Sequence, residues 1–249
     1  INHKSIKMKQ VLLLFLAVLS FSLNAQVVVL HPVNIPSDQV QKFINVETNY
    51  SVKIAQEAVN NGDLAWWGLM QAFNAVEGEY NYMWVNVYKD IDAAVSPKSN
   101  WWNNSESVVG VKPEILLDGV SGAKADRRYF YQMRQQIDSG EPANFVVFNF
   151  ATPDNAAKVL ESNEKYVIPH FKKKMKSSGM KGWGAGTKIA PQGNEYSSFM
   201  TFDGFDTMSN LMKHLSGDGE AVKGFDWTKL EPMEFNSKYI FEVISSTSN

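Results

Sequence analysis

Hydrophobic and polar positions change their period along the chain, and the changes predict two similar series of elements. Apolar residues recur at helical spacing over 37–61 and 154–178, and shorter apolar and aromatic runs flank both segments. In the first half we expect helices at 37–61 and from about 90, with strands at 27–33, 64–73, 79–88 and 126–136. In the second half we expect helices at 154–178 and 205–215, with strands at 144–150, 182–189, 196–203 and 238–245.

The two halves align without a gap at an offset of 117 residues. Pro36 then meets Pro153, Gly62 meets Gly179, and Trp66 meets Trp183. Proline suits the first turn of a helix, and glycine suits the left-handed residue that ends one. The matches therefore indicate an internal duplication of one structural unit.

Each half has the order strand, helix, strand, strand, helix, strand, which is the ferredoxin-like split unit. Helices cover only one face of such a sheet, so its other face needs a partner. We therefore predict an α+β fold in which two ferredoxin-like βαββαβ units pack sheet to sheet as an intramolecular α/β barrel. The first unit is expected over 26–139 and the second over 143–249. Residues 92–125 interrupt any helical period and are expected to form a long loop or lid, or a partly ordered insert.

The N-terminal residues 1–25 have the features of a secretory signal peptide. Three lysines precede an apolar run over 11–19, and the small residue Ala25 precedes the expected cleavage point. The run is shorter than the ~20 residues of a bilayer span. A membrane anchor is the alternative, because Leu23 fits a cleavage motif poorly.

Composition narrows the expected location and partners. The chain has no cysteine, which excludes disulfides, thiolate metal sites and a cysteine nucleophile. A net charge of −2 gives no general basis for nucleic-acid binding. We expect a periplasmic or secreted protein, without stable membrane insertion after signal removal.

One stretch of the second half carries a family resemblance. Pro169 and His170 lie in the predicted helix, Gly179 follows its end, and aromatic-rich strands come after it. This order resembles the dimeric α/β-barrel superfamily, which includes antibiotic-biosynthesis monooxygenases, EthD-like proteins and NIPSNAP-like proteins. The resemblance covers about residues 27–90 and 143–245. It implies ligand binding, cofactor-free oxidation of aromatic compounds, isomerisation, or haem binding or degradation. The Asn-Trp-His set of haem-degrading members has no residue-by-residue match, so we predict no cofactor.

Aromatic residues on the predicted strands are the candidate ligand-binding groups. Residues 80–88 alternate between an aromatic face and an aliphatic face that includes Met83, Val85 and Val87. We expect the aliphatic face to lie under the helices and the aromatic face to line the barrel interior. The candidates are Tyr80, Tyr82, Trp84, Asn86, Tyr129, Tyr131, Trp66 and Trp183. The alternative is that these rings fill a solid core.

Three residues are candidate catalytic bases. His170 flanks the buried helix face, and its counterpart in the first half is Lys53. It is either a specialised site residue or a hydrogen-bonded flanking histidine. His31 ends a strand and either points into the barrel as a site residue or is a hydrogen-bonded structural histidine. Glu242 lies on the last strand. The histidines lack metal-ligand spacing, so no metal site is predicted.

These features lead to two main functional hypotheses and a third alternative. The first is an exported α/β-barrel protein that binds a small, partly aromatic molecule in the barrel interior. The second is a cofactor-independent monooxygenase or isomerase of the same superfamily, which needs a base in the cavity. The third is an interaction role for the tryptophan-bearing inserts. The sequence shows no recognisable set of acid and base residues, which favours the binding hypothesis. We expect a monomer, because each unit covers the other within one chain.

Overall fold

The computed structural model describes residues 26–118 and 121–248. The predicted signal peptide lies outside these residues. The strands are β1 (Val27–Asn34), β2 (Trp66–Ala72), β3 (Tyr82–Tyr88), β4 (Lys124–Ala125), β5 (Tyr129–Asp138), β6 (Phe145–Ala151), β7 (Met180–Ala190), β8 (Phe199–Phe205) and β9 (Phe235–Ser246). The helices are α2 (Val40–Val46), α3 (Val52–Asn60), α4 (Ile91–Val95), α5 (Ser105–Val109), α6 (Pro113–Asp118), α7 (Ala156–Ser162), α8 (Ile168–Ser178) and α9 (Met208–Ser216). Within the described part of the chain, none of the helices has the length and apolar character needed to cross a membrane.

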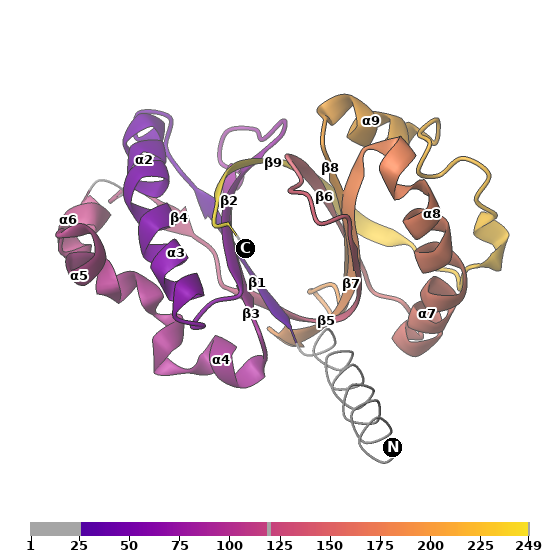
Figure 1. The fold of residues 1–249 in the computed structure, drawn as a ribbon, viewed down its shortest axis with the longest axis horizontal. Helices are drawn as coiled ribbons and strands as arrows, with labels where there is room; N and C mark the ends of the chain where they lie inside the picture. The colour runs from indigo at the N-terminus through magenta and orange to yellow at the C-terminus, as the bar shows by residue number, and fades with distance from the viewer. Residues whose placement is uncertain (1–25, 119–120, 249) are drawn as a thin grey trace, which may run out of the picture.

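Eight strands close into one antiparallel barrel. The strand order is β5-β1-β3-β2 in the first unit and β9-β6-β8-β7 in the second, so both units have the same topology. Pairing of β2 with β9 and of β5 with β7 joins the units at both edges. Figure 1 looks along the barrel, with the helices of the two units on opposite sides of the ring. The expected fold class is confirmed.

Strand alternation divides the core into three parts. On β1, Val27, Val29 and Val33 face the helices, whereas Val28 and Leu30 face the barrel interior. The helix-facing core of the first unit packs under α2 and α3, and that of the second unit packs under α7, α8 and α9. The third core fills the interior of the barrel.

The long helix of each unit contains one π-helical segment. These segments are Glu47–Ser51, between α2 and α3, and Asn163–Val167, between α7 and α8. Their first residues, Glu47 and Asn163, are both buried. Such local widening of a helix is frequent at functional sites.

The expected alignment needs a gap in the second strand. Trp67, which faces the helix-side core, pairs with Asn86 on β3, and Trp183 pairs with Asp203 on β8. Trp183 is therefore the counterpart of Trp67, and the expected match with Trp66 is wrong. The second unit is one residue shorter before this tryptophan, because Trp67 follows Gly62 by five positions and Trp183 follows Gly179 by four.

The insert of the first unit is more ordered than the pattern predicts. Residues 91–118 form three short helices and two 3-10 turns, Pro97–Ser99 and Trp101–Asn104. Gly110 ends α5 in the left-handed conformation, with a φ of 71°. The glycine and proline positions therefore divide the insert into short helices instead of leaving it as a loop.

Candidate functional site

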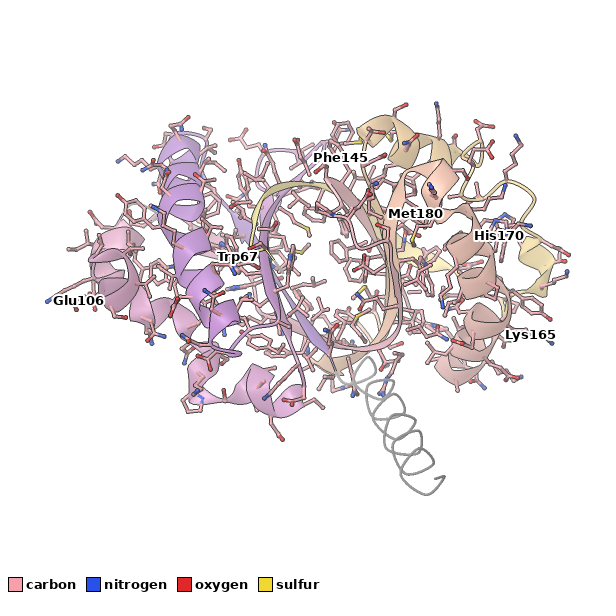
Figure 2. All side chains as sticks on the ribbon, viewed as in Figure 1. Trp67, Glu106, Phe145, Lys165, His170 and Met180 are labelled. Carbon is pink, nitrogen blue, oxygen red and sulfur yellow. The ribbon has the colours of Figure 1, made fainter. Side chains whose placement is uncertain are left out.

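The barrel interior is a packed core. Side chains from β1, β2, β3, β5, β6, β8 and β9 meet there, and Figure 2 shows them between the strands. Strand β7 presents Gly184 and Gly186 to this core. A Cβ atom at Gly184 would lie 2.5 Å from the Phe202 ring and 2.8 Å from the Met133 methyl group. Interior side chains thus press directly on the β7 backbone at these two glycines.

Three of the eight candidate ligand-binding residues do face the interior. Trp66, Tyr129 and Tyr131 pack against the interior core. The Tyr131 hydroxyl donates to the carbonyl oxygen of Ser197 at 3.1 Å, and the Tyr129 hydroxyl donates to Asp126 at 2.6 Å. Both hydroxyl groups are therefore engaged by the protein itself.

The expected orientation of β3 is wrong. Met83, Val85 and Val87 face the barrel interior, whereas Tyr82 and Trp84 belong to the core under the helices. Alternation defines two faces of a strand but does not say which face turns inward. On β3 these aliphatic side chains lie in the interior beside rings from other strands, such as Tyr131, Phe148 and Phe241.

The other three candidates also lie outside the interior. Asn86 accepts a hydrogen bond from the indole nitrogen of Trp101 at 3.0 Å. Trp183 packs in the helix-facing core of the second unit. Tyr80 precedes β3 and is 46% exposed.

None of the three candidate bases lies in the barrel interior. His31 faces the helix side, where its ring centroid lies 5.2 Å from that of Trp84 and its Nε2 donates to the Asp126 carbonyl at 2.9 Å. Burial, with a contribution from Arg128, lowers the pKa of His31. Glu242 is exposed on the outer surface between the units.

His170 lies on α8, on the side toward the segment that follows α9 (Figure 2). Its Nε2 donates to the carbonyl oxygen of Ala221 at 2.9 Å, and its ring lies 5.0 Å from that of Phe225. Of the two interpretations of this residue, the geometry favours a hydrogen-bonded flanking histidine.

A carboxyl group that the sequence reading missed is buried in the first unit. Glu47 begins the π-helical segment and is only 5% exposed. Its carboxyl is hydrogen-bonded to the Trp84 and Ser51 side chains, and among the described residues no cation pairs with it. Burial raises the pKa of Glu47 to about 7, although the two hydrogen bonds act to lower it. The available signal was its place on the apolar face, four residues after Phe43.

The insert closes over this carboxyl. Trp102 donates from its indole nitrogen to the Ser51 hydroxyl oxygen at 3.2 Å, so the insert and Glu47 share one hydrogen-bonded partner. Trp101 and Leu116 are buried in the same core. We call Glu47, Ser51, Trp84 and Trp102 the Glu47 site. It combines a carboxyl that can change its charge near neutral pH with two indole rings.

The second unit has a different polar cluster in its helix-facing layer. Asp203 on β8 accepts a hydrogen bond from Asn149 Nδ2 at 2.7 Å, and His214 Nε2 lies 3.6 Å from its other oxygen. Burial raises the pKa of Asp203, while His214 and Asn149 act in the opposite direction. Asp203 is the counterpart of Asn86, and an acidic residue within an otherwise apolar strand was the missed signal.

Comparison with known proteins places the fold. Neither protein-family models nor curated proteins match the sequence. A solved "putative monooxygenase" from Fusobacterium nucleatum is similar over 90% of this chain and 94% of its own, with a TM-score of 0.54 and 11% identity. A second protein so described, from Lactobacillus acidophilus, covers 90% and 96% with a TM-score of 0.52 and 10% identity. The chain has the dimeric α/β-barrel fold. A mutant chlorite dismutase from Candidatus Nitrospira defluvii, at 7% identity and a TM-score of 0.51, covers 88% of this chain and 91% of its own.

The described residues do not fit a haem or a metal ion. Each described histidine is engaged through Nε2, by a main-chain carbonyl at His31 and His170 and by Asp203 at His214. Ala221 and Phe225 pack directly over His170, where an axial ligand would need open space. Within the described ranges, no three side chains of the metal-binding types come together.

Proposed function

We propose that the protein binds a small, partly aromatic molecule at the Glu47 site, in the layer between the helices and the sheet of the first unit. The observation that carries this proposal is the buried Glu47 carboxyl, which has no cationic partner among the described residues. Burying an unpaired ionisable group is costly, and such groups are concentrated at functional sites. The indole rings of Trp84 and Trp102 supply the aromatic surface beside it.

Glu47 offers a ligand both kinds of hydrogen bond. The protonated carboxyl donates one, and the ionised carboxylate accepts several. Because its pKa is about 7, both forms are populated near neutral pH. A neutral ligand with a hydroxyl or carbonyl group on an aromatic ring matches this chemistry. Entry needs the Trp102–Ser51 hydrogen bond to open, since the insert covers the site.

Cofactor-independent catalysis at the same place is the second candidate function. A general base works best with a pKa close to the working pH, and the raised Glu47 pKa favours this role. Glu47 would take a proton from substrate carbon or oxygen and leave the electron pair on the substrate. Isomerisation returns that proton to another atom, whereas monooxygenation consumes dioxygen as co-substrate.

Native mass spectrometry of the purified protein tests the binding proposal. We expect a bound small molecule on the wild-type protein and on Glu57→Gln, and its loss from Glu47→Gln. Glu57 lies on the exposed face of α3, so its variant is a matched control for the loss of one carboxyl group. Equal occupancy in Glu47→Gln, or no bound molecule in any sample and no binding from a panel of hydroxylated aromatics, would refute the proposal.

Export remains part of the proposal. The lysines and apolar run ahead of Ala25 support secretion to a periplasm or the medium. N-terminal sequencing of the protein from fractionated cells tests this. Mature protein beginning at Gln26 outside the inner membrane is the expected result, and an uncleaved, membrane-associated chain would contradict it.

A further inference from the structure

The second unit holds a buried acid and a buried imidazole side by side, and the Glu47 site uses neither. The side chains of Asp203 and His214 are 7% and 10% exposed. Asp203 Oδ1 and His214 Nε2 are 3.6 Å apart, which is an ion-pair distance and longer than a hydrogen bond. Asn149, on β6, donates a hydrogen bond to the other carboxylate oxygen. The carboxyl is thus fixed by the sheet and faces the imidazole on α9.

The carboxylate determines which imidazole nitrogen carries the proton. Lys238 on β9 is the other charged group that acts on Asp203, and it does so without forming an ion pair. A carboxylate opposite Nε2 favours the tautomer with hydrogen on Nε2. Nδ1 of His214 is then an unprotonated acceptor.

That second nitrogen is buried without a hydrogen-bond partner among the described residues. Buried polar atoms are nearly always paired, so an exception calls for an explanation. The surroundings are aromatic: the ring centroids of Phe205 and Phe171 lie 5.1 Å and 6.1 Å from that of His214. Trp183 follows behind Phe171, at 6.1 Å between centroids. The carboxylate keeps the proton on Nε2, and the lone pair on Nδ1 is surrounded by aromatic rings. This is the arrangement of a general base for an aromatic substrate.

This arrangement is specific to the second unit. In the first unit the counterpart of Asp203 is Asn86, an amide that already accepts a hydrogen bond from Trp101. The two copies therefore differ at the position that decides the chemistry. Sheet topology alone does not require an acid there, since the first unit has the same topology without one.

We propose that His214 is the acid–base group of a second site, for a small planar aromatic molecule with one weakly acidic hydroxyl group, and that Asp203 is its positioning residue. In the step, Nδ1 takes the hydroxyl proton: the O–H bond breaks, its electron pair stays on oxygen, and an N–H bond forms. The Asp203 carboxylate pairs with the resulting imidazolium. With phenol, whose hydroxyl group is a weaker acid than imidazolium, the proton stays on oxygen and the complex is hydrogen-bonded. Transfer to Nδ1 proceeds further as the hydroxyl group of the ligand becomes more acidic.

The segment that follows α9 packs against the helix that carries His214. A Cβ atom at Gly219 would lie 2.8 Å from the His214 main-chain nitrogen, so this segment packs tightly on α9. The His170 bond to Ala221 holds the next residues against α8.

Phenol and benzene are matched probes, because they differ by the hydroxyl group. We expect the intact protein to bind phenol at least about ten-fold more tightly than benzene, measured by titration with imidazole-nitrogen NMR. His214 should show the Nε2–H tautomer when free, and phenol should shift its Nδ1 resonance toward the hydrogen-bonded value. His214→Gln keeps a donor toward Asp203 and removes the base. In a Glu47→Gln background, where the Glu47 site has lost its carboxyl group, it should lose the preference for phenol and keep benzene binding.

Asp203→Asn tests positioning separately from stability. Without the carboxylate, His214 should populate both tautomers, a change that a merely structural role for Asp203 would not produce. Equal binding of the two probes, no binding of either, or a doubly protonated His214 at neutral pH would overturn the proposal. These outcomes come from the wild-type protein, so they stand even where a variant fails to fold. The shift of the His214 Nδ1 resonance reports binding beside this imidazole alone, which separates this site from the Glu47 site.

Discussion

Replacing Glu47 with glutamine should remove a pH-dependent loss of stability. Burial raises the Glu47 pKa from its ordinary value of 4.5 to about 7, so between these values the folded chain holds a proton that the unfolded chain has lost. The stabilising contribution of this group is therefore complete below about pH 4.5 and falls as the pH rises to about 7. The difference between the two pKa values corresponds to about 3 kcal/mol in the free energy of unfolding.

Urea unfolding followed by tryptophan fluorescence measures this effect. The free energy of unfolding is compared for wild type, Glu47→Gln and Glu57→Gln between about pH 5 and about pH 8. The variant at position 47 should gain up to about 3 kcal/mol on the wild-type protein as the pH rises, because glutamine fills the same space without ionising. A difference that stays constant within about 0.5 kcal/mol would refute the reasoning, and Glu57→Gln should follow the wild type throughout.

Three further comparisons test the packing of the helix layers and of the barrel interior. Trp101→Phe removes an indole hydrogen bond from a buried ring and should lower the free energy of unfolding by about 1 kcal/mol, whereas Trp227→Phe, at a ring that is 56% exposed, should change it little in the same urea assay. Met200→Ala empties part of the barrel interior and should cost about 2–5 kcal/mol by thermal or urea unfolding; a cost below about 1 kcal/mol would contradict a packed interior. Gly179→Ala should destabilise more than Gly217→Ala in calorimetry, because both glycines have positive φ but only the first is crowded by neighbouring side chains.

The order of helices and strands could be predicted from the sequence, because the spacing of apolar residues along the chain reflects local structure. The helix expected over 154–178 is observed over 156–178, and the strand expected over 144–150 is observed over 145–151. The repeated order of elements then limits each unit to one sheet topology, and the unpaired sheet edges close on each other. The barrel could therefore be predicted without knowing any contact between the halves.

The site could not be predicted in the same way, because it depends on which face of each strand turns inward. The two faces of β3 were assigned the wrong way round, and this moved Trp84 from the interior to the helix layer. The π-helical segment changes which residues of the long helix point to the sheet, and it brings Glu47 against Trp84. The Asp203–His214 pair forms between a strand and a helix that no spacing rule connects.

Closure of the barrel through the β2–β9 and β5–β7 pairings has a consequence for how the two copies can change. In a barrel assembled from two identical subunits, symmetry gives both halves the same side chain at every equivalent position. Covalent fusion removes that restraint, while the shared edges keep either half from separating. One copy can then carry Asn86 where the other has Asp203. A single polypeptide thus gains room for two unlike chemistries on one symmetric framework.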